Sequence, residues 1–228
     1  MDLKPTVIDL MRSPLLIIIF LFGCWLSESH AQSPKRLLEE VRDLQTKYDS
    51  LYSPGEQTFV FAGSSSIRFW ETLPDIFPGV QVVNSGFGGS MASDLLAYLD
   101  ELVLDYQPDK VFLYEGDNDI FEKKSPAKIV RQTRRIIRRI QKHNGPTPIV
   151  VISAKPSLVR WHLKKKYEKL NTRLKALCDK DPSTSYAHIW DSMLEDGVVK
   201  KEIFLEDGLH MNAEGYSLWE TILKPLGN

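Results

Sequence analysis

The stretches that decide the fold are Lys110-Val111-Phe112-Leu113-Tyr114-Glu115 and Pro148-Ile149-Val150-Val151-Ile152-Ser153. Both are near-continuous apolar runs, without the alternation of apolar and polar residues seen when one face of a strand meets water. An unbroken apolar run of this length is typical of a strand that is covered on both faces. The two stretches therefore predict central strands of a parallel sheet with helices on either side.

Working outward, three more short runs raise the number of predicted strands to five: Thr58–Ala62, Val80–Asn84 and Tyr186–Trp190. Apolar residues at helical spacing lie between and beside these runs, and each stripe predicts the inner face of a helix. The stripes are Leu37, Val41, Leu44, Tyr48, Leu51; Leu95, Tyr98, Leu99, Leu102; Ile129, Ile136, Ile137, Ile140; Tyr167, Leu170, Leu174, Leu177; and Leu218, Trp219, Ile222, Leu223. Alternating helices and strands predict an α/β fold, a three-layer α/β/α sandwich around a five-stranded parallel sheet.

Composition and charge narrow the class of protein. The 228 residues are 43% hydrophobic and 26% charged, which is typical of one ordinary globular domain. A formal net charge of -1 gives no reason to expect a nucleic-acid partner. Of the two cysteines, Cys178 lies in a helical pattern, where a lone cysteine is usually a small core residue.

Residues 1–31 resemble a secretory signal peptide. Arg12 precedes an apolar run of 12 residues, Leu15–Leu26, which is shorter than the ~20 residues that a membrane-spanning helix needs. Cleavage after Ala31 would leave residues 32–228 as a single domain, secreted or periplasmic. Two alternatives remain open: lipid attachment at Cys24, which would anchor the protein to the cell envelope, and an uncleaved membrane anchor.

A run of basic residues coincides with the third helical stripe and falls on the side opposite its isoleucines. It consists of Arg131, Arg134, Arg135, Arg138, Arg139 and Lys142. The simplest interpretation is a solvated helix face. The alternative is attraction to an anionic envelope surface or polysaccharide.

Polar motifs follow the predicted strands, at the edge where ligands bind in open α/β sheets. They are Gly63-Ser64-Ser65-Ser66, Asn84-Ser85-Gly86-Phe87-Gly88-Gly89-Ser90, Gly116-Asp117-Asn118-Asp119 and Asp207-Gly208-Leu209-His210. Each motif alone has a structural explanation, such as helix capping by the serines or a local turn at Asn118. Together they supply what acyl transfer requires: a hydroxyl nucleophile, an imidazole base held by a carboxylate, and donors for an oxyanion.

We therefore expect a serine of the first motif as nucleophile, His210 as base and Asp207 as its orienting carboxylate. The backbone N–H groups of Ser65 and Gly89 and the side-chain amide of Asn118 are the expected oxyanion donors. No short His/Cys/Asp cluster suggests a metal site, and no cofactor is expected.

The order of these motifs resembles that of the SGNH (GDSL-like) hydrolase family over essentially the whole of residues 32–228. The resemblance implies a flavodoxin-like sheet, Ser65 as the nucleophile, Gly89 and Asn118 in the oxyanion hole, and the pair Asp207 and His210. One departure is that the family's Gly-Asp-Ser triplet reads Gly63-Ser64-Ser65 here.

The expected function is hydrolysis of acyl esters, with acetyl or other short acyl esters of carbohydrate favoured and lysophospholipid as a second substrate class. Two alternatives use the same cleft: an O-acyltransferase and a non-catalytic glycan-binding module. Trp70 and Trp161 are candidates to line a sugar subsite, although packing is the more common role for tryptophan in such loops.

Overall fold

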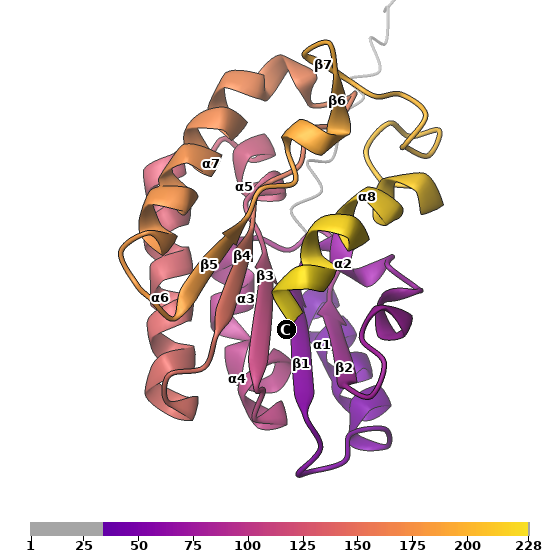
Figure 1. Ribbon diagram of the computed structural model, residues 1–228. Coiled ribbons are helices and arrows are strands. Elements are labelled where there is room, and N and C mark those ends of the chain that lie inside the picture. The colour runs from indigo at the N-terminus through magenta and orange to yellow at the C-terminus, as the bar shows by residue number, and fades with distance from the viewer. Residues whose placement is uncertain (1–33, 228) are drawn as a thin grey trace, which may run out of the picture. The chain divides into compact units, whose positions relative to one another are not determined.

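The computed structural model of the protein describes residues 34–227, which form a five-stranded parallel sheet covered by helices on both faces (Figure 1). The strands are β1 Thr58–Gly63, β2 Gln81–Gly86, β3 Lys110–Tyr114, β4 Ile149–Ile152 and β5 Thr184–Ala187. They pair in the order β2-β1-β3-β4-β5, and every pairing is parallel. The predicted α/β/α sandwich with a flavodoxin-like sheet is confirmed. In this order the connections after β1 and β3 lead to opposite sides of the sheet, and the carboxyl edge at such a switch point is where ligands bind in open α/β sheets.

Two helical layers enclose the sheet. The α-helices are α1 Pro34–Asp49, α2 Ser65–Arg68, α3 Ala92–Ala97, α4 Leu99–Leu102, α5 Asp117–Phe121, α6 Pro126–Asn144, α7 Lys164–Cys178 and α8 Ala213–Leu223. Helices α1, α3, α4, α6 and α7 contribute buried side chains to one face, while α2 and α8 cover the other. A two-stranded antiparallel ribbon, β6 Leu194–Glu195 and β7 Val198–Val199, was not predicted because its strands are too short for a period to register.

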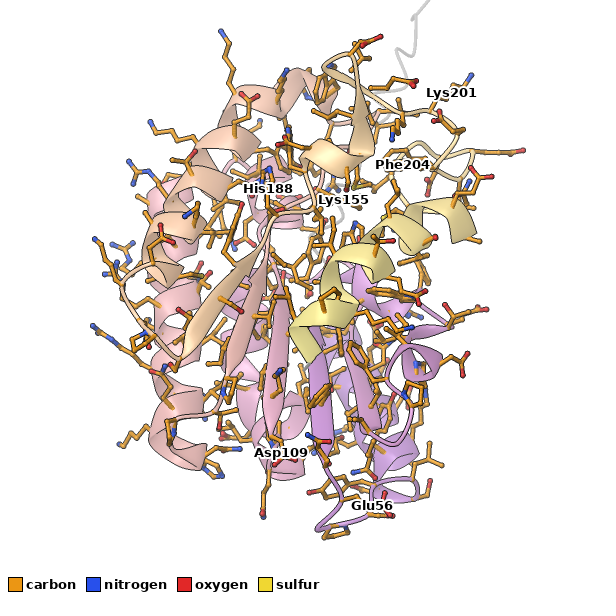
Figure 2. All side chains as sticks on the ribbon, viewed as in Figure 1. Glu56, Asp109, Lys155, His188, Lys201 and Phe204 are labelled. Atoms are coloured by element: carbon orange, nitrogen blue, oxygen red, sulfur yellow. The ribbon has the colours of Figure 1, made fainter. Side chains whose placement is uncertain are left out.

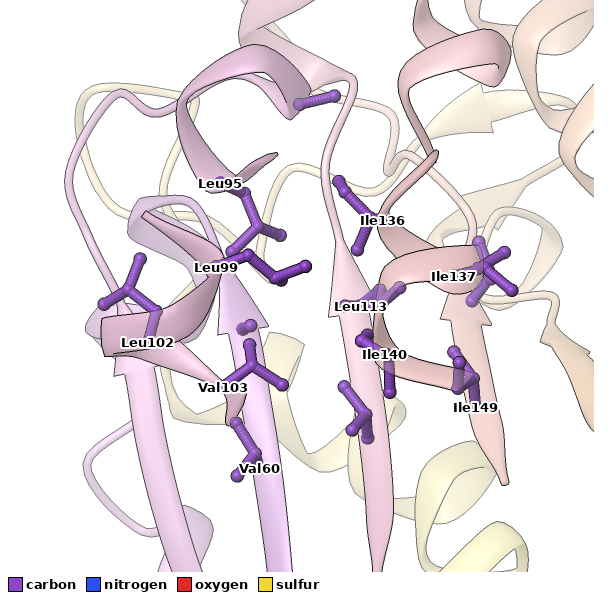
Figure 3. Close-up of a cluster of buried hydrophobic side chains, with 14 of the residues drawn as sticks. Val60, Leu95, Leu99, Leu102, Val103, Leu113, Ile136, Ile137, Ile140 and Ile149 are labelled. Atoms are coloured by element: carbon purple, nitrogen blue, oxygen red, sulfur yellow. The ribbon is translucent and has the colours of Figure 1, made fainter. Parts of the chain in front are cut away.

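Alternation along the strands divides the core into two clusters. Val111 and Leu113 of β3 belong to the cluster formed with side chains of α3, α4 and α6. Figure 3 shows Leu113 among these aliphatic side chains. Phe112 and Tyr114 point to the opposite face, and Phe112 stacks on Phe61 of β1 with ring centroids 4.1 Å apart. Because both sets are buried, the sequence of β3 reads as a continuous apolar run.

Several predicted boundaries differ from those in the structure, and three of the differences have a local reason. Leu51 does not continue the stripe of α1, since that helix ends at Asp49 and the Leu51 side chain is 61% exposed. The stripe around Tyr98 forms two short helices because the chain leaves helical geometry at that residue. The last strand ends at Ala187, where Ile189 donates its N–H to the Ser153 side chain and does not extend the ladder.

The basic residues of α6 occupy the outer face, as predicted. Ser125 caps the helix by accepting a hydrogen bond from the Lys128 N–H. Arg131, Arg134 and Arg138 are exposed on the side away from the buried isoleucines. Within residues 34–227, no helix has both the length and the apolar character needed to span a bilayer.

Cys178 is buried at the end of α7, and burial raises the pKa of its thiol to about 11. The prediction of a core cysteine is therefore confirmed. The predicted signal peptide and the alternative of lipid attachment at Cys24 both lie outside the described residues.

Candidate active site

The first motif places its three serines at the start of α2, directly after β1. Ser64 and Ser66 are buried, whereas Ser65 is partly exposed and its Oγ lies 3.0 Å from His210 Nε2. The Ser64 side chain makes no capping hydrogen bond, so the interpretation of this motif as a side-chain helix cap fails. Among the three adjacent hydroxyls, that of Ser65 is the one beside the imidazole.

A glycine at the end of β2 fixes the position of this turn. A Cβ at Gly86 would lie 2.1 Å from the backbone nitrogen of Arg68, which no real structure tolerates. The absence of a side chain therefore allows α2 to pack directly against the end of β2. This contact holds Ser65 beside the loop that carries Gly89.

Asp207 and His210 form a compact turn. One oxygen of Asp207, Oδ1, accepts the N–H groups of Leu209 and His210, both at 2.9 Å. The other, Oδ2, lies 2.5 Å from His210 Nδ1. Burial alone would raise the pKa of Asp207, but these hydrogen bonds outweigh it and lower that pKa below its usual value. Asp207 is therefore ionised at neutral pH and can fix the tautomer of the imidazole.

The expected oxyanion donors belong to the segments that follow β1, β2 and β3. Ser65 is the first residue of α2, and the first N–H groups of a helix have no intrahelical partner. Gly89 has φ of +69°, a left-handed conformation that favours glycine. Asn118, in the first turn of α5, donates one amide hydrogen to the Ser90 carbonyl at 2.9 Å, and its amide has a second hydrogen to offer.

A buried cluster of charged side chains next to Asn118 was not predicted. Asp117 accepts a hydrogen bond from Arg160 at 2.6 Å and one from the Tyr167 hydroxyl at 2.6 Å. Lys155 Nζ lies 3.5 Å from Asp117 Oδ2 and donates to the Leu209 carbonyl at 2.6 Å. The sequence signal was Lys155 itself, a charge placed three residues after the end of the fully apolar strand β4. Figure 2 places Lys155 at the carboxyl edge of the sheet and Asp109 at the opposite edge.

The pKa shifts in this cluster are consistent with an ion-paired centre. Burial raises the pKa of Asp117, but the charges of Lys155 and Arg160 outweigh this effect, and the net shift is downward. Burial lowers the pKa of Lys155, and Asp117 opposes that change. The carboxylate is therefore compensated by two cations.

Apolar side chains are exposed around the same site. Phe69 meets the His210 ring edge to face, with centroids 4.9 Å apart, and Phe121 covers the Arg160 guanidinium at 4.5 Å. Val159 contacts the turn at Gly208, and Leu205 donates its backbone N–H to the His210 carbonyl. We call Phe69, Phe121, Val159 and Leu205 the apolar rim.

The two tryptophans proposed for a sugar subsite are engaged in packing. Trp70 is 1% exposed and lies against Tyr216 and Trp219. Trp161 stacks on Trp190 at 6.0 Å. Among residues 34–227, no group of three or more His, Cys, Asp or Glu side chains is arranged to hold a metal ion.

The flavodoxin-like sheet, with Ser65, His210 and Asp207 gathered at its carboxyl edge, is the architecture of the SGNH hydrolases. Residues 49–218 match the GDSL-like Lipase/Acylhydrolase family. The chain belongs to this family.

Solved structures support the assignment of the fold. A Streptococcus pneumonia protein provisionally described as a platelet activating factor is 25% identical, with a TM-score of 0.73 over 84% of this chain and 94% of that one. A GDSL-like lipase from Bacteroides thetaiotaomicron is 22% identical, with a TM-score of 0.69 over 82% and 96%. An acetylxylan esterase from Geobacillus stearothermophilus is 16% identical, with a TM-score of 0.64 over 76% and 95%. A search of curated protein sequences finds no match.

Proposed function

We propose that the protein is a serine ester hydrolase that uses Ser65, His210 and Asp207. The observation that carries the proposal is one chain of contacts, 3.0 Å from Ser65 Oγ to His210 Nε2 and 2.5 Å from His210 Nδ1 to Asp207. A hydroxyl becomes a useful nucleophile when a base of fixed tautomer can take its proton. This arrangement also favours an enzyme over a glycan-binding module, because binding alone would not need hydrogen-bonded contacts from Ser65 through His210 to Asp207.

In the proposed mechanism Ser65 Oγ attacks the ester carbonyl while His210 Nε2 takes the hydroxyl proton. The carbonyl oxygen becomes an oxyanion, which accepts hydrogen bonds from the N–H groups of Ser65 and Gly89 and from the Asn118 amide. His210 then gives its proton to the departing alcohol, leaving an acyl group on Ser65. Water, activated by His210, attacks this acyl-enzyme, releases the acid and restores the serine.

For the substrate we propose short acyl esters, with acetyl groups on carbohydrate as the first candidate. The likeness to an acetylxylan esterase supports this choice through the fold only. The second candidate is the acyl ester of a lysophospholipid, which the apolar rim favours because Phe121, Val159 and Leu205 are each at least 50% exposed. We further propose that the protein is exported, since a secreted or periplasmic enzyme, or one lipid-anchored through Cys24, would meet both substrate classes.

The test is a series of 4-nitrophenyl esters from acetate to palmitate, assayed with the wild type and with Ser65→Ala. We expect the highest kcat/KM on acetate and its loss in Ser65→Ala by a factor of at least about 10³. Ser64→Ala is the matched control, because this neighbouring hydroxyl is buried and makes no capping bond. Full activity in Ser65→Ala would overturn the proposal, and a maximum at long chains would favour the lipid substrate.

Two further measurements separate the alternatives. A fluorophosphonate probe should label Ser65 in an enzyme and leave a glycan-binding module unlabelled. Product analysis with an added sugar acceptor distinguishes a hydrolase, which releases free acid, from an O-acyltransferase, which acylates the sugar.

A further inference from the structure

Arg160 lies in the connection after β4 and contacts the start of α5, which carries the expected oxyanion donor Asn118. Its side chain is only 9% exposed. The Nη1 atom donates to Asp117 Oδ1 at 2.6 Å and to Asn118 Oδ1 at 3.1 Å. A single guanidinium nitrogen therefore bridges the carboxylate of one residue and the amide oxygen of the next.

This contact fixes which end of the Asn118 amide faces which neighbour. The Oδ1 atom meets the cation, and Nδ2 donates to the Ser90 carbonyl at 2.9 Å. A flip of the amide by 180° would place its NH₂ group against a guanidinium that has only donors, and its oxygen against a carbonyl. Both contacts would then be repulsive, so the amide is held with its hydrogens on the side of the Gly89 loop.

The charge of Arg160 also strengthens the donor. A cation at the oxygen of an amide draws electron density from its nitrogen, which makes the N–H bonds more polar. Hydrogen bonds that involve an ionised group polarise their neighbours in a medium of low dielectric constant. The Asn118 amide therefore offers more positive hydrogens to a developing oxyanion than an isolated asparagine would.

The guanidinium is itself firmly held. Asp117 pairs with it, and Phe121 of the apolar rim covers it with the guanidinium carbon 4.5 Å from the ring centroid. Lys155 approaches the same carboxylate from the other side. Removal of Arg160 would thus leave Asp117 with a second cation and with the Tyr167 hydroxyl, so the buried carboxylate would keep partners.

We propose that Arg160 is a positioning residue of the esterase, which orients and polarises the Asn118 amide for the oxyanion while touching no substrate itself. The inference rests on the proposed function. It predicts that Arg160 acts on kcat through Asn118, and that it has no effect on kcat once the amide is absent.

The test is a double-mutant cycle with Arg160→Gln, Asn118→Ala and the double variant, measured on 4-nitrophenyl acetate. Loss of one oxyanion donor lowers kcat by about 10² to 10³. A donor that is present but misoriented should lower kcat less, so we expect a fall of about 10 to 100-fold in Arg160→Gln. KM should change by less than about twofold. In the Asn118→Ala background, Arg160→Gln should change kcat by less than about twofold, because the two residues act as a unit.

Two variants separate this role from a purely structural one. Arg160→Lys keeps a cation beside Asp117 for folding. Its side chain is shorter and lacks the planar guanidinium that lies on the Phe121 ring, so the ammonium would not occupy the position of Nη1 beside the Asn118 oxygen, and we expect kcat to fall at least about fivefold. Arg139→Gln is the matched control, since Arg139 also bridges a carbonyl and a carboxylate, those of Leu96 and Asp100 on the outer layer. Arg139→Gln should leave kcat unchanged. The melting temperatures of all variants show whether each one is folded.

Additive losses in the cycle, or a rise in KM with unchanged kcat, would overturn the inference while leaving the esterase intact. A wild type that neither hydrolyses the ester nor reacts with fluorophosphonate at Ser65 would remove the proposed function, and this inference with it.

Discussion

Replacement of Asp207 by asparagine tests the candidate site most directly. In the native turn the Asp207 carboxylate accepts from His210 Nδ1, so Nε2 is free to accept the Ser65 proton. An asparagine would offer its NH₂ group or its oxygen at the same place. With the NH₂ group facing the ring, the imidazole would carry its proton on Nε2 and donate to Ser65 instead of accepting from it.

The size of the effect follows from the exposure of the carboxylate. In a fully buried serine-protease triad the same change costs about 10⁴ in kcat. A hydrogen bond to a charged group contributes about 1.5–3 kcal/mol, or roughly 10 to 150-fold in rate, before the tautomer is considered. The Asp207 side chain is 47% exposed, so water can partly replace it. We expect kcat to fall by about 10² to 10³.

The assay is hydrolysis of 4-nitrophenyl acetate at neutral pH, with KM expected to stay within about twofold. The chain offers a matched control in His188 and Asp191, a second pair three residues apart with 2.9 Å between Nε2 and Oδ2. Asp191→Asn breaks this exposed pair and should leave kcat unchanged. Activity of Asp207→Asn within about threefold of the wild type would refute the reasoning that the carboxylate sets the tautomer.

Three further predictions concern other parts of the domain. Burial, and to a smaller extent the neighbouring Asp119, raises the pKa of Glu115 well above its usual value. The folded state therefore loses stability as the pH rises above about 4.5. The difference in melting temperature, Glu115→Gln minus wild type, should be larger at pH 8 than at pH 5. Burial raises the pKa of Cys178 to about 11, so iodoacetamide at pH 8 should alkylate it, as mapped by peptide mass spectrometry, only after unfolding. Activity should be unchanged in excess EDTA; a loss that one divalent ion restores would contradict the metal-independent mechanism.

The fold was predictable because its central strands are buried on both faces. Phe112 and Leu113 point to opposite sides yet both are apolar, and a run of this length and composition is typical of a strand covered on both faces. The ends of elements were less predictable, since they depend on contacts between distant segments. The end of β5 is an example, because a hydroxyl from the loop after β4 takes the N–H of Ile189.

The site was predictable to the extent that its groups follow strands of one parallel sheet. Ser65, Asn118 and His210 could be assigned to one edge from their order in the chain. The sequence pattern alone does not decide among the three serines. The family resemblance selects Ser65, and so does the structure, in which Ser65 is partly exposed and lies beside His210. The ion-paired cluster could not be derived, since the pairing of Asp117 with Arg160 joins two loops whose mutual approach no local pattern encodes.

The turn that carries Asp207 and His210 has a mechanical consequence. Base and carboxylate lie three residues apart and share backbone hydrogen bonds, so they translate together when the loop moves. Leu158 and Lys155 clamp this loop at Gly208 and Leu209 to the segment after β4. In the proposed mechanism the distance between the imidazole and the Ser65 hydroxyl is then the one separation that this turn leaves to vary, and an increase of about one ångström would be enough to lower the rate about 10²-fold.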